Sequence, residues 1–346
     1  MGYWNEVKEK LDNVYKALQD DESRKLFDAR VQYMIAHNDK QYIDRIYELN
    51  KLYPKKWRCP EIEKRLEGDQ TIIIYGCGHD GEMIKNILEV CNYSVIYWCD
   101  SNRNLWGTYK EGIKVISPED LGKNYKESLL IIGSKKYELE IRRRLYDIDF
   151  PTKNIFTFVY NHALCGKQYF DMFAPKDYEV FVDAGAYNGD SINVFLEWVR
   201  DKEYKVYAIE PLEDMCEVIK DKHIPNVEIV NCAAWNKNEK LCFDLDARGS
   251  TIREKGLYLG GGMIDEIVKN DKVSFIKMDI EGAELKALEG AKETILKYKP
   301  RLAICIYHKY EDIYEIGDYI LSLNPNYKLY IRHYTTCMWE TVLYAV

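Results

Sequence analysis

Two acidic side chains in the second half of the chain follow apolar segments and are placed to meet a ligand. Asp183 ends one such segment and leads directly into a Gly-x-x-x-Gly turn, from Gly185 to Gly189, and Glu210 ends the next apolar segment. Glycine has no Cβ, so the backbone of such a turn can pass close beneath a ligand. A carboxylate at the end of the following strand can accept hydrogen bonds from both hydroxyls of a ribose. These residues therefore predict a nucleoside-like ligand.

The charge of this turn indicates which ligand it would suit. Its sequence, D-A-G-A-Y-N-G-D from Asp183 to Asp190, is rich in carboxylates. Carboxylates repel a pyrophosphate and attract a sulfonium or an ammonium group, so the turn favours S-adenosylmethionine over NAD. Ligands of open α/β sheets lie outside the carboxyl ends of the strands. The expected cofactor contacts are Asp183, Gly185, Ala186, Tyr187, Gly189, Asp190, Glu210, Cys232 and Ala233.

Two further strand ends supply groups for a reaction. Asp279 ends an apolar segment and His308 follows another, so both should face the methyl group from the acceptor side. An imidazole has the better intrinsic pKa for a general base near neutrality, whereas Asp279 could be the base or could orient the acceptor. A third option is a divalent metal held by Asp279, Glu281 and His308, since carboxylates and imidazole suit such ions. Glu281 could equally complement the dipole of the helix that it begins.

A mostly parallel sheet would bring these side chains to one edge. Apolar segments rich in β-branched and aromatic residues predict seven strands, and helical spacing predicts the segments between the earlier ones. The last two strands are joined by only a short segment, so they should form an antiparallel hairpin. The expected fold class is α/β, a seven-stranded doubly wound sheet of the class I methyltransferase layout. Its strands are Val180–Ala186, Val206–Glu210, Val227–Ala233, Phe275–Asp279, Arg301–Tyr307, Tyr327–His333 and Thr341–Val346, and its helices are Ser191–Arg200, Leu212–Lys222, Glu284–Lys297 and Tyr310–Leu323.

Five motifs, taken together and in order, resemble the FkbM family of S-adenosylmethionine-dependent methyltransferases. They are D-A-G-A-Y-N-G-D-S (183–191), A-I-E-P (208–211), G-S-T (249–251), I-K-M-D-I-E-G-A-E (276–284) and I-Y-H-K (306–309). The resemblance covers about the C-terminal half of the chain. It implies O-methylation of a sugar or another hydroxylated compound, with the G-S-T motif in a loop near the acceptor. We therefore expect a small-molecule or glycan acceptor contacted by Ser250 and Glu281.

A second α/β pattern precedes this region. A buried strand, Thr71–Tyr75, leads into G-C-G-H-D-G from Gly76 to Gly81, and Asp100 follows the next strand, Ser94–Cys99. This spacing fits a dinucleotide fingerprint. Only two further strands are clear, Leu129–Gly133 and Ile155–Val159, so the second half of a dinucleotide fold is missing. A docking, sugar-nucleotide-binding or degenerate domain is favoured over a working NAD site.

The chain is therefore expected to have three parts: a helical segment (1–68), a smaller Rossmann-like domain (69–160) and a class I methyltransferase domain (161–346). Helical spacing appears at Val7–Leu18, Ser23–Met34 and Tyr42–Leu49. These helices should pack on the Rossmann-like domain or on a second subunit. In the second case the protein would be a homo-oligomer.

Composition limits the remaining classes. A net charge of −8 argues against a nucleic acid partner. No segment suits a membrane span or a secretory signal, and the ten cysteines lack a C-x-x-C pair, which is typical of buried thiols in a reducing compartment. A cytoplasmic O-methyltransferase is the leading expectation. The alternatives are a nucleotide-sugar or NAD-dependent enzyme that uses the Gly76 turn, and a non-catalytic assembly protein of a glycan pathway.

Overall fold

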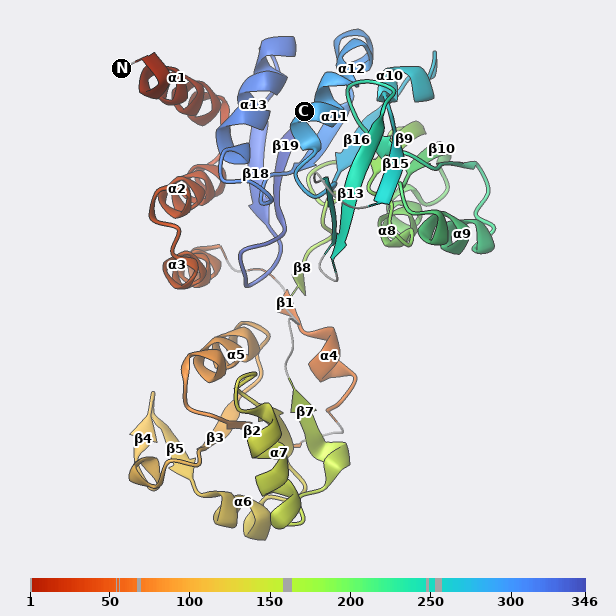
Figure 1. Ribbon diagram of the computed structural model, residues 1–346. Coiled ribbons are helices and arrows are strands. Elements are labelled where there is room, and N and C mark those ends of the chain that lie inside the picture. Colours follow the sequence, from red (N-terminus) through yellow and green to blue (C-terminus); the bar gives the residue numbers. More distant parts are fainter. Residues whose placement is uncertain are drawn as a thin grey trace. The chain divides into compact units, whose positions relative to one another are not determined.

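The computed structural model describes residues 2–53, 55, 57–66, 70–157, 164–246, 249–252 and 257–346. The chain forms two compact units (Figure 1). The first combines Met1–Leu49 with Lys167–Tyr334 and Met338–Val346, and the second contains Asn50–Gly166 and Thr335–Cys337. The first unit is thus built from segments that precede and follow the second unit in the sequence.

A seven-stranded sheet forms the centre of the first unit. Its first five strands are parallel, and β19 is antiparallel to both of its neighbours. This confirms the expected α/β sheet with an antiparallel strand at its end. The order is β11 (Val227–Val230), β10 (Glu203–Ile209), β9 (Tyr178–Ala184), β16 (Phe275–Met278), β17 (Arg301–Cys305), β19 (Thr341–Ala345) and β18 (Leu329–His333).

Helices follow most of the parallel strands, as expected. They are α8 (Asp190–Val199), α9 (Glu213–Asp221), the short α10 (Ile264–Ile267), α11 (Glu284–Glu289), α12 (Lys292–Tyr298) and α13 (Asp312–Leu323). The helix predicted over 284–297 is in fact two helices. It breaks at Gly290, where a Cβ would lie 2.0 Å from the carbonyl oxygen of Trp235, so the chain passes too close there for any side chain.

Aromatic side chains fill the core beside β9. Phe181 of β9 stacks on Phe195 of α8 with their ring centroids 4.7 Å apart, and Phe275 of β16 lies 5.1 Å from Phe181. Phe170, just before β9, contacts all three rings edge-on or tilted. All four side chains are buried, and such pairs favour offset or edge-to-face contacts. This packing fixes β9 and β16, whose carboxyl ends carry the predicted site.

A second, four-stranded sheet is formed by strands between Ala233 and Gly262, where the sequence analysis predicted only a loop at the G-S-T motif. Its order is β12 (Ala233–Ala234), β15 (Leu257–Gly262), β13 (Lys240–Asp246) and β14 (Gly249–Ile252). The G-S-T motif therefore lies in a strand, where Ser250 pairs with Leu245, and the expected loop is wrong. The Ser250 side chain lies outside the described residues. Glycines and polar residues interrupt the apolar pattern here, which hides the strands.

Three N-terminal helices complete the first unit: α1 (Gly2–Ala17), α2 (Asp21–Ala36) and α3 (Asp39–Leu52). Helix α1 packs against α13, and α2 packs against β18. Lys10 forms an ion pair of 3.0 Å with Glu315, and Arg332 forms one of 2.6 Å with Asp20. The expectation that these helices pack on the Rossmann-like domain is therefore wrong, and residues 1–49 do not stand apart from the methyltransferase-like sheet.

The second unit contains a six-stranded sheet. Its order is β4 (Tyr109–Lys110), β5 (Ile113–Ile116), β3 (Val95–Cys99), β2 (Ile72–Tyr75), β6 (Leu129–Ile132) and β7 (Ile155–Thr157), and all pairs except β4–β5 are parallel. Helices α5 (His79–Val90), α6 (Pro118–Asn124) and α7 (Glu138–Asp147) belong to this unit. The sequence missed the short strands β4 and β5, so the sheet is larger than expected. Residues 158–159 of the strand predicted at Ile155–Val159 lie outside the described residues.

Three short elements also belong to the second unit. Strand β1 (Trp57–Arg58) pairs antiparallel with β8 (Leu164–Cys165), and α4 spans Pro60–Glu63. Among the helices described in either unit, none is both long and apolar enough to cross a membrane.

Candidate active site

The turn after β9 is held against two neighbouring strands. The backbone N–H groups of Gly185 and Ala186 donate to the carbonyl of Ile209, at 3.0 and 3.2 Å. Gly185 has φ 77°, and a Cβ there would lie only 1.9 Å from the carbonyl oxygen of Asp279. Gly189 has φ 81° and immediately precedes α8. Glycine at 185 thus lets the turn lie directly against the end of β16.

Asp183 is fully buried and is already engaged by protein groups. Its Oδ1 lies 2.9 Å from Lys277 Nζ, and its Oδ2 accepts a short hydrogen bond from Ser191. Lys277 also donates to the carbonyl of Gly185 at 2.7 Å. The structure therefore places Asp183 as a group that holds Lys277 and the turn, whereas the sequence suggested direct contact with the cofactor. Lys277 was not predicted, although a lysine within an apolar strand was the available signal.

Glu210 stands at the end of β10 with 5% of its surface exposed. Its Oε2 accepts from the backbone N–H of Tyr187, and its Oε1 from that of Leu212, both at 2.9 Å. Burial raises the pKa of Glu210, and these two hydrogen bonds oppose the rise. A carboxylate oxygen has more than one acceptor position, so Glu210 can bind two ribose hydroxyls as well.

The other predicted cofactor residues surround this position. Tyr187 is 59% exposed with φ 46°, Asp190 begins α8 at the surface, and Ala186 is buried in the turn. Cys232 follows β11, and Ala233 begins β12. Burial raises the pKa of the half-buried Cys232 thiol to about 11, so the thiol is neutral and suits the flank of an uncharged ring.

Asp279 follows β16 and is held by two tyrosines. The Tyr169 and Tyr307 hydroxyls donate to its two oxygens, each at 2.9 Å. Burial alone would raise the pKa of Asp279, but the charges of Lys277 and His308 outweigh it and hold the pKa below its usual range. Tyr169 lies in no regular element, so no sequence pattern predicts its place beside Asp279.

His308 lies between three carboxylates. Its Nδ1 is 2.9 Å from Glu284 Oε1, and its Nε2 is 3.5 Å from Asp279 Oδ1 and 3.6 Å from Glu281 Oε2. Burial alone would lower the pKa of His308, but these carboxylates raise it to about 9. At neutral pH the ring is therefore protonated, which argues against the free imidazole base expected from the sequence.

Glu281 and Glu284 approach His308 from the segment that follows β16. Glu281 has φ 56° and precedes Gly282, which has φ 91°, so the chain turns sharply before α11. Helix α11 begins at Glu284, and Glu281 lies outside it, which differs from the expectation that Glu281 begins the helix. Glu284 is fully buried and was not predicted, although it ends the I-K-M-D-I-E-G-A-E motif.

A further carboxylate, Glu340, stands beside Asp279. Gln168 Nε2 donates to Tyr169 Oη at 2.9 Å and forms a shorter hydrogen bond to Glu340. The Tyr307 hydroxyl lies 3.5 Å from Glu340 Oε1. Burial, followed by the charge of Asp279, raises the pKa of Glu340 to about 7. The sequence missed both Gln168 and Glu340, because each lies outside the predicted strand ends.

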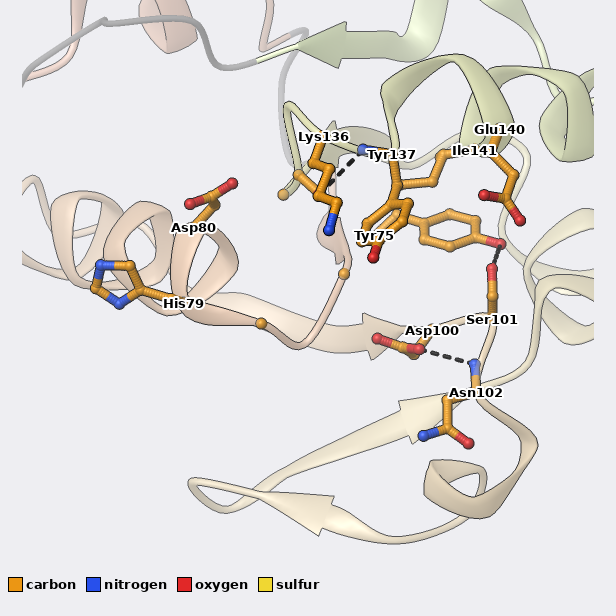
Figure 2. A pocket seen from close by; sticks show the side chains of 14 residues that line it. Tyr75, His79, Asp80, Asp100, Ser101, Asn102, Lys136, Tyr137, Glu140 and Ile141 are labelled. Atoms are coloured by element: carbon orange, nitrogen blue, oxygen red, sulfur yellow. Dashed lines mark hydrogen bonds between the residues drawn. The ribbon is translucent and has the colours of Figure 1, made fainter.

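The second unit contains a separate pocket of about 520 Å³ at the carboxyl ends of β2, β3 and β6 (Figure 2). Gly76, Gly78 and Gly133 line it, and a Cβ at Gly78 would meet no atom within 4 Å. Asp100 accepts from the backbone N–H groups of Cys77 and Asn102, both at 2.8 Å. The predicted glycine fingerprint thus borders an open pocket, and its acidic residue, Asp100, is hydrogen-bonded to the backbone of the glycine turn.

Two domain families match the sequence. Residues 68–156 match the family described as C2185-like, N-terminal. Residues 259–334 match the Methyltransferase FkbM domain, and this stretch contains Asp279, Glu281, Glu284 and His308. The chain carries an FkbM methyltransferase domain. The match confirms the resemblance and the methyltransferase class, and we call the first unit the FkbM unit below.

Solved structures with similarity to the chain are distant. An FkbM methyltransferase from Methylobacillus flagellatus is 19% identical, with 90% of this chain and 100% of that chain covered and a TM-score of 0.46. A putative methyltransferase from Streptococcus mutans, in complex with SAH, is 14% identical, with coverages of 49% and 89% and a TM-score of 0.29. Fibrillarin from Aeropyrum pernix, with natively bound S-adenosyl-L-methionine, is 8% identical, with coverages of 51% and 71% and a TM-score of 0.32. No curated protein matches the chain.

Proposed function

We propose that the FkbM unit is an S-adenosylmethionine-dependent O-methyltransferase that acts on a carbohydrate or another hydroxylated metabolite. The observation that carries the proposal is the pairing of the Gly185 turn with Glu210. The turn lies against the backbone of Asp279, and the Glu210 carboxylate stands at the end of the adjacent strand. A donor bound there through its ribose would lie beside the cluster at Asp279.

The charge around this position supports a cationic donor. The acidic residues here are Asp190, Glu210, Asp279 and Glu281. Lys277 already forms an ion pair with Asp183. A sulfonium is attracted to such surroundings, and a pyrophosphate is repelled. The charge therefore supports S-adenosylmethionine over a dinucleotide in the FkbM unit.

Methyl transfer is an in-line displacement. The acceptor oxygen forms a bond to the methyl carbon as the carbon–sulfur bond breaks, the electron pair stays on sulfur, and the hydroxyl proton must leave. Holding the acceptor in line supplies much of the rate. We assign this positioning to Asp279, whose two oxygens are fixed by Tyr169 and Tyr307, and to His308.

Calorimetry of the full chain with S-adenosylmethionine, and separately with NAD, tests the donor. We expect binding of the first and none of the second in the FkbM unit. Mass spectrometry of glycans and small metabolites from cells with and without the protein then tests the acceptor, through a 14-dalton difference calculated for one added CH₂. Binding of NAD without S-adenosylmethionine would overturn the proposal.

The pocket of the second unit favours a second candidate function, binding of a sugar nucleotide or a related polar ligand. It lies where strand order reverses, since β2 pairs with β3 on one side and β6 on the other. Lys136 and His79 are the basic side chains among its lining residues. Calorimetry with UDP-sugars tests this candidate, and the absence of binding to any of them would favour a docking role.

A further inference from the structure

We propose that the FkbM unit binds a divalent metal ion between His308, Asp279 and Glu281, and that this ion holds the acceptor hydroxyl. The role of the ion rests on the proposed methyltransferase function. Its binding does not, because it can be measured without a methyl donor.

Two carboxylates approach the same ring nitrogen of His308. His308 Nε2 lies 3.5 Å from Asp279 Oδ1 and 3.6 Å from Glu281 Oε2. Two ligands bound to one ion at about 2.1 Å and at right angles lie about 3 Å apart. Each carboxylate therefore lies about 0.5 Å farther from Nε2 than a second ligand of one ion would, so binding of the ion requires both carboxylates to close on it. Hydrogen bonds at these distances would be weak, so the contacts are poorly explained as direct pairs.

The buried ring nitrogens provide a second observation. The side chain of His308 is only 9% exposed, and its Nε2 makes no hydrogen bond within the described residues. A buried polar atom without a partner carries a free-energy penalty. Because Nε2 faces the carboxylates of Asp279 and Glu281, a bound cation would satisfy this nitrogen and interact favourably with both.

Glu284 is placed to orient the imidazole of His308. Its Oε1 lies 2.9 Å from His308 Nδ1 and accepts from the backbone N–H of Ile280 at 3.0 Å. Histidine ligands of metals are usually oriented through the second nitrogen by a carboxylate or a carbonyl. One ligand atom each from Asp279, Glu284 and His308 lies within 4.8 Å of the others, so this supporting carboxylate lies close to two of the proposed ligands.

Charge balance favours the ion over a simple salt bridge. Asp279, Glu281 and Glu284 surround one imidazole, which carries at most a single positive charge. Lys277, the nearest buried lysine, is paired with Asp183. Buried charges are costly unless they are paired or coordinate a metal, and a divalent ion supplies the missing positive charge.

The ligand set indicates the class of ion and its use. One imidazole with two carboxylates suits Mn²⁺ or another first-row divalent ion. An ion polarises a bound hydroxyl and makes its proton easier to lose. During transfer, the oxygen would form its bond to the methyl carbon, the electron pair of the breaking carbon–sulfur bond would remain on sulfur, and the hydroxyl proton would pass to water.

Mn²⁺ binding to the full chain, stripped with chelator and kept free of methyl donor, tests the site. Electron paramagnetic resonance measures the concentration of free Mn²⁺. Displacement of bound Mn²⁺ by Zn²⁺ shows whether the site prefers the second ion. We expect one tight equivalent, a loss of more than tenfold in affinity in His308→Gln and in Glu281→Gln, and a loss of roughly 10- to 100-fold in Glu284→Gln. Glu293→Gln, on the exposed face of α12, is the matched control and should bind as the wild type does.

Circular dichroism must show that each variant is folded, and the partly exposed Glu281 is the variant least expected to disturb the core. The proposal is overturned if the wild type binds neither Mn²⁺ nor Zn²⁺, or if the variants bind as the control does. Calorimetry with S-adenosylmethionine on the same samples separates the two proposals. Metal binding without donor binding would reject the proposed function alone, and donor binding without metal binding would reject the ion alone.

Discussion

At the scale of single residues, Glu210 contributes to the fold and to the proposed donor site together. Its carboxylate fixes the backbone of Tyr187 in the turn and that of Leu212 before α9. The same group faces the space expected for a ribose. A substitution there therefore changes both the ligand contacts and the shape of the turn.

Glu210→Ala should weaken S-adenosylmethionine binding by more than tenfold. The change removes charge-assisted hydrogen bonds worth roughly 1.5–3 kcal/mol each. Isothermal calorimetry measures the loss, with Glu217→Ala on exposed α9 as the control. Wild-type affinity in a folded Glu210→Ala protein would contradict the donor site.

Cys232 should react slowly with iodoacetamide at pH 7 and faster as the pH rises. Its pKa of about 11 leaves the thiolate scarce at neutrality, and the thiolate is the reactive form. The rate should increase about tenfold per pH unit from 7 to 9, whereas a free thiol with a pKa of about 8.5 begins to level off. Peptide mass spectrometry follows the alkylation, and glutathione is the reference. A plateau near pH 8.5 at Cys232 would show that the thiol is less buried than described.

Sequence reasoning found the residues at strand ends but not their partners. Asp279, Glu210 and Gly185 follow apolar segments, so the strand pattern alone places them at one edge. Tyr169 lies 110 positions before Asp279, and no local pattern joins the two. The same limit led to the expectation of a free imidazole at His308, because its pKa depends on carboxylates that only the fold brings near.

At the scale of elements, the turn between β9 and α8 depends on Gly185. Gly185→Ala should lower the unfolding temperature of the FkbM unit and weaken donor binding. A residue with a Cβ costs about 1–2 kcal/mol in the left-handed region, and this Cβ would also strike the Asp279 carbonyl at 1.9 Å. Calorimetric unfolding measures the first effect, and donor titration measures the second.

Gly107→Ala is the control for the backbone cost, measured on the unfolding of the second unit, to which Gly107 belongs. Gly107 has the same φ of 77°, but a Cβ there would meet nothing within 4 Å. It should therefore show the backbone cost without the clash. Equal losses in the two variants would mean that the turn has room to move away from β16.

Most of the strands that the sequence predicted share one property: their apolar residues are buried in a parallel sheet. Strands buried on both faces give continuous apolar segments, which are easy to recognise. Strands β12 and β14 are short, and β15 is rich in glycine, so the pattern of these three strands is weak. The break between α11 and α12 depends on Trp235, more than 50 residues earlier, and could not be predicted locally.

At the scale of the whole molecule, the two units should bind their ligands independently. Gly78→Val should abolish ligand binding in the pocket of the second unit and leave S-adenosylmethionine affinity unchanged. The new side chain would enter open space in that pocket, and the backbone at Gly78, with φ −81°, accepts any residue. Paired titrations of the donor and a UDP-sugar measure both effects. Loss of donor binding in a folded Gly78→Val protein would contradict two separate sites.

The discontinuous first unit has a consequence for how the protein is made. Helices α1 to α3 leave the ribosome first, yet α1 packs on α13 and α2 packs on β18, which are synthesised more than 250 residues later. Most of the second unit is continuous, from Asn50 to Gly166, so it can fold early. The side chains of Val14 in α1 and of Leu18 just after it are completely buried in the finished protein, and they remain uncovered in the nascent chain until then. Chaperones that bind exposed apolar segments during translation should therefore meet this protein first at its N-terminal helices.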